Sequence, residues 1–390
     1  MSIALWFMVL PLALALTFFT LEVLVGLKPL APVEEVHTPG QLAVLIPAHN
    51  EAANIAGTLA ALSSEVPSGC RVLVVADNCS DATAQITRSL SVEVIERTDP
   101  VRRGKGFALD FGRAHLAERP PQTVVILDAD CRFQPHGLER LVAGVRRGRP
   151  AQAVYLLDKA ESTSPLVQIS NFAFLVKNLV RNRALMRLGG CALLTGTGMA
   201  FPWATFARAP LATADIVEDL GLTLCMIRGG TPPILIDRAQ VRSTAASTRD
   251  TAAQRTRWEH GFLAKALRYG PALLWSGVRS RKRSEVALGL HLLVPPLALL
   301  FLLSGATLLT LLLVHPYGDV AAQTLALGLS LTIASLATLL ARWQVGSELV
   351  SISALLSVPF YIAWKMPLYV RFLIARETRW IRTGRGNDTN

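Results

Sequence analysis

The chain has 390 residues, of which 51% are hydrophobic and 17% are charged, and its formal net charge is +11. This apolar content indicates membrane segments, while the basic excess suits a nucleic acid, an anionic membrane surface or a phosphorylated substrate. The odd number of cysteines, without any C-x-x-C pair, argues against a disulfide framework or a zinc site. They are Cys70, Cys79, Cys131, Cys191 and Cys225.

The N-terminal segment is apolar, because Ser2 to Leu21 contain no charged side chain. A helix of this length, at about 1.5 Å per residue, spans the roughly 30 Å of a bilayer core. A cleaved signal peptide is disfavoured, since no basic residue precedes the run and no A-x-A site follows it. We therefore expect a transmembrane helix within residues 1–30.

Residues 40–260 alternate between short β-branched runs and helical patterns, which predicts a mainly parallel sheet covered on both faces. The predicted strands are Leu42–Pro47, Arg71–Ala76, Val92–Glu96 and Thr123–Leu127. The predicted helices are Asn54–Ser63, Asp81–Leu90, Gly106–Ala117 and Leu138–Val145. Active sites of such sheets lie at the carboxyl ends of the strands.

The last third is apolar again. Val286–Val314, despite Pro295-Pro296, and Val320–Ala341 lack charged residues and predict two transmembrane helices within residues 285–342. Leu349–Trp364 is short for a span, and we assign residues 347–390 to a membrane-associated segment with a basic tail.

Phe262–Val278, within residues 261–284, has the pattern of an amphipathic helix lying on the membrane surface. Basic clusters at Arg279–Arg283 and Lys365–Arg385 predict, by the positive-inside rule, that both lie in the cytoplasm with the catalytic domain. The basic excess thus faces a lipid bilayer, with a bacterial inner membrane expected. No stripe of aromatic and basic residues indicates a nucleic acid partner.

Asp128-Ala129-Asp130 directly follows a predicted strand. Two carboxylates at this spacing can hold Mg²⁺ or Mn²⁺ while leaving positions for diphosphate oxygens. Taken alone, the motif is also typical of a solvated acidic turn.

Asp77 ends another strand, where it can accept a hydrogen bond from a base or simply stabilise a turn. Lys105, in the R-R-G-K-G loop, offers a point charge to phosphate, although the loop lacks the Walker spacing. Glu51 belongs to the segment PAHNE after the first strand, whose backbone groups can cradle a nucleoside.

Glu218 and Asp219 lie in a polar island between apolar segments, where one can act as a general base while the other holds a positioning contact. Gln254, Arg257 and Trp258 occupy one face of a predicted helix. Arginine suits diphosphate recognition and tryptophan suits a sugar ring, although a tryptophan at a membrane interface is a common alternative.

The ordered series PAHNE, ADNCSD, RGKG, DAD, VED and QRTRW, from Leu42 to His260, resembles glycosyltransferase family 2. It is most similar to the membrane-bound branch that holds cellulose, chitin, hyaluronan and poly-N-acetylglucosamine synthases and ceramide glucosyltransferase. The resemblance implies a GT-A type (Rossmann-like) α/β mixed sheet catalytic domain with transmembrane and interfacial α-helices.

The resemblance also implies roles for single residues. Asp219 would be the catalytic base, Asp130 would ligate the metal, and Asp128 would contact the metal or the diphosphate. The residues implied in donor or acceptor binding are Asp77, Lys105, Glu218, Gln254, Arg257 and Trp258, with Thr197 and Gly198 in the loop that lines the acceptor pocket, and Glu51 in the PAHNE segment.

We therefore expect inverting, metal-dependent transfer of a sugar from a nucleotide-diphosphate sugar, with a UDP-sugar favoured, to a hydroxyl of a polysaccharide or a lipid-linked acceptor. Three or four spanning helices barely form a polymer channel, so polymerisation would need export partner proteins or a homo-oligomer. The alternatives are a nucleotidyltransferase and a non-catalytic nucleotide-sugar-binding membrane protein.

Overall fold

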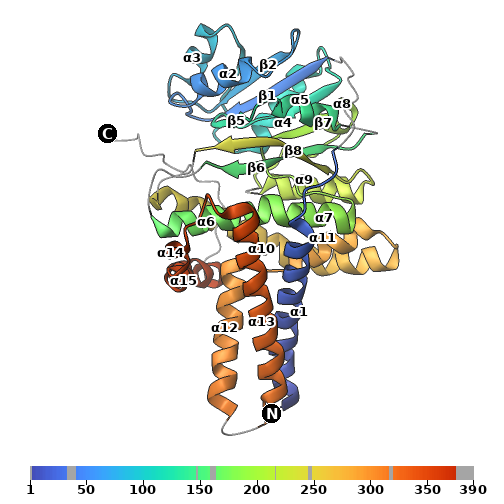
Figure 1. Cartoon of the computed structure of the whole chain (residues 1–390). Coiled ribbons are helices and arrows are strands. Elements are labelled where there is room, and N and C mark those ends of the chain that lie inside the picture. The colour runs from blue at the N-terminus through green and yellow to red at the C-terminus, as the bar shows by residue number, and fades with distance from the viewer. Residues whose placement is uncertain are drawn as a thin grey trace. The chain divides into compact units, whose positions relative to one another are not determined.

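The structure is a computed structural model that describes residues 2–32, 41–145, 148–158, 164–215, 217–244, 248–315 and 319–374. The chain divides into two compact units. Within the described residues, unit 2 comprises Pro29–Asp158 and Gly190–Ala246 and holds the sheet (Figure 1). Unit 1 comprises Met1–Lys28, Lys159–Gly189 and Ser247–Glu377, and is helical.

Unit 2 is built on one eight-stranded sheet with the order β3-β2-β1-β4-β7-β6-β8-β5. The strands are β1 (Leu42–Ala48), β2 (Arg71–Asp77), β3 (Glu93–Arg97), β4 (Thr123–Ile126), β5 (Cys131–Phe133), β6 (Ala151–Leu157), β7 (Met199–Pro202) and β8 (Ile234–Ser243). The four predicted strands became β1 to β4 and pair in parallel. β7 runs antiparallel to both β4 and β6, so the sheet is mixed.

Four helices of unit 2 follow the strands as the alternation predicts, namely α2 (Ile55–Ser63), α3 (Thr83–Ser89), α4 (Lys105–Leu116) and α5 (Gly137–Ala143). The described part of this unit also contains α8 (Trp203–Phe206) and α9 (Glu218–Arg228), which the alternation did not predict. One hydrophobic core lies between the sheet and α4, α8 and α9, and includes the fully buried Leu45, Leu73, Leu109, Phe201 and Phe206. Burying each such side chain contributes about 1.5–3 kcal/mol, so this core fixes the strand ends that carry the motifs.

Unit 1 contains three helical segments that are long and apolar enough to cross a membrane, Ala4–Gly26, Leu297–Val314 and Ala321–Gly346. They pack together as α1, α12 and α13 (Figure 1). The helices of this unit are α1 (Ser2–Gly26), α6 (Pro165–Leu175), the π-helix η1 (Val176–Arg181), α7 (Asn182–Gly189), α10 (Thr248–Arg279), α11 (Arg283–Leu293), α12 (Leu297–Val314), α13 (Ala321–Ala341), the π-helix η3 (Arg342–Gly346), α14 (Ile352–Leu355) and α15 (Val358–Ile374).

The boundaries of the membrane segments differ from the predicted ones. The predicted span Val286–Val314 is broken at Pro295-Pro296, since proline lacks the N–H that a helix needs. The span therefore begins at Leu297, and the residues before the prolines form α11. The N-terminal helix continues past Leu21 and includes the buried Glu22, whose carboxylate is paired with Arg181.

Two predicted domain boundaries also differ. The predicted interfacial helix Phe262–Val278 lies inside α10, so the boundary after residue 260 falls within one continuous helix. The segment with α6, η1 and α7, predicted as part of a catalytic domain at 40–260, belongs to the compact unit of the membrane helices. Leu349–Trp364 is divided between α14 and α15, and the basic tail after residue 374 lies outside the described residues.

Candidate active site

Asp128-Ala129-Asp130 forms the short connection between β4 and β5. The backbone N–H of Asp128 donates to Thr197 Oγ1 at 3.0 Å, and the backbone N–H of Cys131 donates to the Asp128 carbonyl at 3.0 Å. Ligand atoms of Asp128, Asp130 and Cys131 lie within 4.8 Å of one another. The tight turn after β4 thus gathers two carboxylates at one point, as the spacing predicted.

The donor set at this turn fits a hard divalent cation through its two carboxylates. The Cys131 thiol is buried, and burial, followed by the nearby Asp130 charge, raises its pKa well above the usual value. It therefore stays protonated and is a poor ligand for Mg²⁺ or Mn²⁺, which prefer oxygen. Asp128 and Asp130 are thus the residues at this turn that could hold such a cation.

Lys105, the first residue of α4, donates from Nζ to a carboxylate oxygen of Asp128 and to the Gly196 carbonyl at 2.9 Å. Its Nζ also lies 4.0 Å from Glu218 Oε1. Burial opposes its charge, but Asp128 and Glu218 outweigh burial, so the pKa of Lys105 is raised and it stays cationic. The next residue must be Gly106, since a Cβ there would lie 2.4 Å from the Leu211 carbonyl oxygen.

Glu218 and Asp219 form the first turn of α9 instead of the irregular polar island that the sequence suggested. Burial raises the pKa of the Glu218 carboxyl to about 8, although Lys105 opposes the shift; the Asp219 charge adds to it. Asp219 Oδ1 accepts from the Leu220 backbone N–H at 2.7 Å. A Cβ built on Gly196 would lie 3.5 Å from Lys105 Nζ and 3.8 Å from Asp219 Oδ2, so these groups meet at this loop.

The loop Thr195–Gly198 is held by Gln152, a residue that sequence reasoning missed. The fully buried Gln152 accepts from the Thr195 backbone N–H at 2.9 Å through Oε1 and donates to the Thr197 carbonyl at 2.9 Å through Nε2. Gly198 has a φ of +62°, and a Cβ there would lie 2.8 Å from Val241 Cγ2. The sequence feature that could have indicated Gln152 is its position as a single glutamine within the otherwise apolar run that forms β6.

Asp77, the last residue of β2, belongs to a second polar cluster. Its carboxylate pairs with Arg97 at 2.6 Å, and its carbonyl contacts His49 Nδ1 at 2.7 Å. The Asp77 carboxylate is buried, and the positive charge of Arg97 offsets the free-energy cost of burying it. Arg97, at the end of β3, was not predicted, because its partner is on a neighbouring strand rather than near it in the sequence.

The remaining predicted residues are Glu51, Gln254, Arg257 and Trp258. The Glu51 carboxylate accepts from Asn54 Nδ2 at 2.7 Å in the loop after β1. Gln254 and Arg257 lie on α10, which begins at Thr248, but their side chains are outside the described part of the chain. Trp258 stacks on Phe174 within unit 1, with ring centroids 5.8 Å apart. None of the five cysteines forms a disulfide in the structure.

Comparison with known families decides the assignment. Residues 43–201 match the model of glycosyl transferase family 2, and residues 123–370 match that of glycosyl transferase family group 2. The second match covers more than half of the chain. The chain belongs to glycosyl transferase family group 2. The predicted enzyme class and the GT-A type fold are thereby confirmed, whereas the polymer-synthase branch stays a prediction.

Solved structures include relatives in fold of this glycosyltransferase. One is the mannosyltransferase PcManGT from Pyrobaculum calidifontis in complex with GDP-Man and Mn²⁺. It is 18% identical, with a TM-score of 0.59 over 96% of this chain and 99% of that one. Another is glucosyl-3-phosphoglycerate synthase from Mycobacterium tuberculosis in complex with Mn²⁺, UDP and phosphoglyceric acid, at 19% identity and a TM-score of 0.39, covering 58% and 78%. No curated protein sequence matches the chain.

Proposed function

We propose that this glycosyltransferase moves a sugar from a nucleotide-diphosphate sugar to an acceptor hydroxyl with inversion at the anomeric carbon. The observation that carries the proposal is the cluster around Lys105. Its ammonium donates to the Gly196 carbonyl and lies close to the carboxylates of Asp128 and Glu218, and Asp219 lies beside Gly196. These groups come from separate segments of the sequence, and together they offer carboxylates for a cation, a fixed ammonium for phosphate and a candidate base.

The donor diphosphate is held, in this proposal, at the Asp128–Asp130 turn. Asp128 and Asp130 would hold Mg²⁺ or Mn²⁺, which supplies positive charge to the leaving diphosphate. Mn²⁺ in the similar mannosyltransferase supports this reading. Lys105 adds a second cationic group, and Asp77, oriented by Arg97, accepts a hydrogen bond from the base of a UDP-sugar.

Asp219 is the proposed general base. It removes the proton of the acceptor hydroxyl, whose oxygen attacks the anomeric carbon while the bond to the diphosphate breaks. The Leu220 N–H holds one oxygen of Asp219 and so fixes the orientation of the carboxylate. A base positioned in this way contributes about 10²–10⁴-fold to the rate. The neutral Glu218 and the Thr197–Gly198 loop position the acceptor.

We place the reaction at the cytoplasmic face of a bacterial inner membrane. The three spanning segments and the basic residues at Arg279–Arg283 support an integral membrane protein of this orientation. The acceptor is then a lipid-linked molecule or a growing polysaccharide, and Gln254, Arg257 and Trp258 contribute to its binding or to that of the diphosphate.

The test is incubation of the purified protein, in membranes, with a panel of radiolabelled nucleotide sugars. Labelled product, with the new bond inverted relative to the donor, supports the proposal, and extraction into organic solvent distinguishes glycolipid from polymer. Absence of both transfer and donor hydrolysis with every nucleotide sugar would favour a protein that only binds nucleotide sugars.

A further inference from the structure

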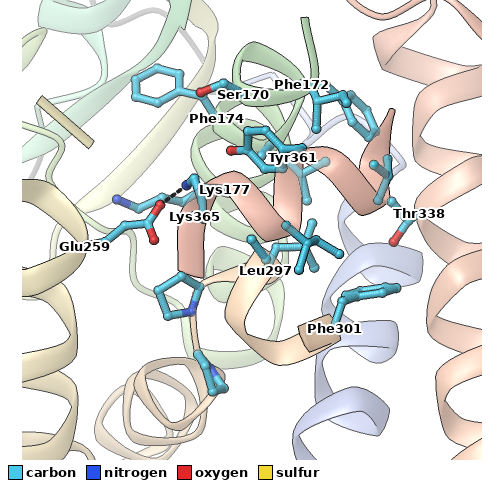
Figure 2. Close-up of a pocket in the computed structure, with 18 of the residues that line it drawn as sticks. Ser170, Phe172, Phe174, Lys177, Glu259, Leu297, Phe301, Thr338, Tyr361 and Lys365 are labelled. Carbon is cyan, nitrogen blue, oxygen red and sulfur yellow. Dashed lines mark hydrogen bonds and ion pairs between the residues drawn. The ribbon is translucent and has the colours of Figure 1, made fainter. Parts of the chain in front are cut away.

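Unit 1 contains a cavity of about 180 Å³ whose described lining residues all belong to this unit (Figure 2). Its wall is mostly apolar and aromatic, with Phe172, Leu297, Phe301 and Tyr361 among the lining residues. Sites for whole drug-sized ligands measure about 300–1,000 Å³, so this volume suits a section of a chain-like molecule.

The wall includes residues from all three spanning segments, namely Phe19 of α1, Phe301 of α12 and Thr338 of α13. These segments are apolar enough to lie in hydrocarbon. A molecule that enters such a cavity from the bilayer needs an apolar portion, because polar and charged groups are costly there.

Two polar atoms of the wall have no hydrogen-bond partner although they are buried, Ser170 Oγ and His291 Nε2. Ser170 is 1% exposed and His291 is fully buried. His291 Nδ1 contacts the carboxylate of Glu22, which is paired with Arg181 and can only accept. The ring proton therefore lies on Nδ1, and Nε2 is an acceptor. The described wall thus includes a hydroxyl that can donate and a nitrogen that accepts.

The described wall carries the basic side chains of Lys177, Arg181 and Lys365 and the acidic side chain of Glu259. Lys365 donates to Glu259, as Figure 2 shows, and the Arg181 charge is balanced by Glu22, which does not line the cavity. Lys177 Nζ lies 5.9 Å from the centre of the Phe262 ring. A mostly apolar wall that carries the Lys177 ammonium favours a ligand that is apolar over most of its length and anionic at one end.

We propose that this cavity binds a lipid phosphate, with a hydrocarbon segment along the aromatic wall and a phosphate monoester that contacts Ser170, Lys177 and His291. A phosphate monoester has oxygens that accept from Ser170 and Lys177, and a P–OH that donates to His291 Nε2. The proposal goes beyond the proposed function, because it gives unit 1 a lipid-phosphate site of its own.

The test is photolabelling of the full chain, in nanodiscs of uncharged lipid, with dodecyl phosphate that carries a diazirine in its alkyl chain. We expect crosslinks on cavity residues of α6, α12 and α15, located by peptide mass spectrometry. Ala298→Phe, which places a ring in the cavity, should reduce them to background. The matched control is Ala322→Phe, at an exposed position of the apolar helix α13.

The charge is tested by Lys177→Gln, which should lower labelling about fivefold, the effect of one lysine near an anionic lipid headgroup. Arg279→Gln, at an exposed position of the same unit outside the cavity, should leave labelling unchanged. Ser170→Ala should lower labelling by the phosphate without changing labelling by the matched dodecanol probe.

Equal labelling by dodecanol and dodecyl phosphate, in wild type and in Lys177→Gln, would overturn the proposal. So would loss of labelling in an excess of inorganic phosphate, since that would indicate an anion site without lipid selectivity. Donor hydrolysis is measured on the same preparation. Hydrolysis without specific labelling rejects the lipid site alone, and specific labelling without hydrolysis or transfer rejects the proposed function and leaves the lipid site standing.

Discussion

Lys105 and Asp128 form an ion pair across 23 positions of the sequence, joining the start of α4 to the turn after β4. The same ammonium lies within 4.0 Å of Glu218. One lysine thus balances the negative charge of carboxylates from two further segments. Removing it should show how much the ion pairs of this cluster contribute to the stability of the protein.

We expect Lys105→Met to lower the free energy of unfolding of the metal-free protein by about 1–3 kcal/mol, because the partly buried carboxylates of Asp128 and Glu218 lose their counter-charge. Adding Asp128→Asn should restore part of this loss, and denaturant unfolding of both single variants and the double variant measures the coupling. Strictly additive effects would show that the pair contributes no interaction energy.

Metal dependence is predicted from Asp128 and Asp130. Excess chelator should abolish transfer, and Mn²⁺ or Mg²⁺ should restore it. Asp130→Asn should weaken Mn²⁺ binding, followed by electron paramagnetic resonance, by at least about tenfold, since it removes a direct ligand. The exposed Glu118→Gln, which also removes one carboxylate, is the matched control. Transfer that persists in chelator would exclude the role given to Asp130.

The raised pKa of Glu218 predicts a pH dependence of stability. In the unfolded chain this carboxyl ionises near its ordinary pKa of 4.5, whereas in the folded protein it ionises at about 8. Between these values the folded state binds the extra proton, so its contribution to stability falls as pH rises from about 4.5 to 8. In Glu218→Gln, the apparent melting temperature of the metal-free protein should fall less over this range. A slope equal to that of wild type would contradict the assignment.

Gly198→Ala should destabilise the protein by about 1–3 kcal/mol, because a side chain at φ +62° is strained and its Cβ would press on Val241. The change should also displace Thr197 and lower transfer. Gly69→Ala shares the positive φ but meets nothing within 4 Å, so it isolates the backbone strain from the clash. Thermal unfolding that gives the same loss for both variants would show that contact with Val241 is unimportant.

The sequence predicted the first half of the sheet well because β1, β2 and β4 are largely apolar, β-branched runs followed by polar motifs, and β3 has Val94 and Ile95 at its centre. It did not predict the antiparallel β7, since strand direction depends on pairing between distant segments. The prolines 295 and 296 were visible, yet the absence of charge around them suggested one continuous span.

At the site, motif order predicted Asp128, Asp130 and Lys105 as members of one family pattern, but not the ion pair between Lys105 and Asp128. The contacts of Gln152 and Arg97 are set by strand register, which no local pattern encodes. Nor did the sequence indicate that α6, η1 and α7 belong to the compact unit of the membrane helices, because that depends on packing against α1 and α11.

The role of Asp219 as the base is the central claim, and the most direct measurement compares transfer and nucleotide binding in Asp219→Asn. The substitution keeps the size of the side chain and its contact with the Leu220 N–H, but removes the proton acceptor. We predict a rate of sugar transfer lower by at least about 10²-fold, with nucleotide affinity nearly unchanged. Transfer by Asp219→Asn at the wild-type rate would contradict the account.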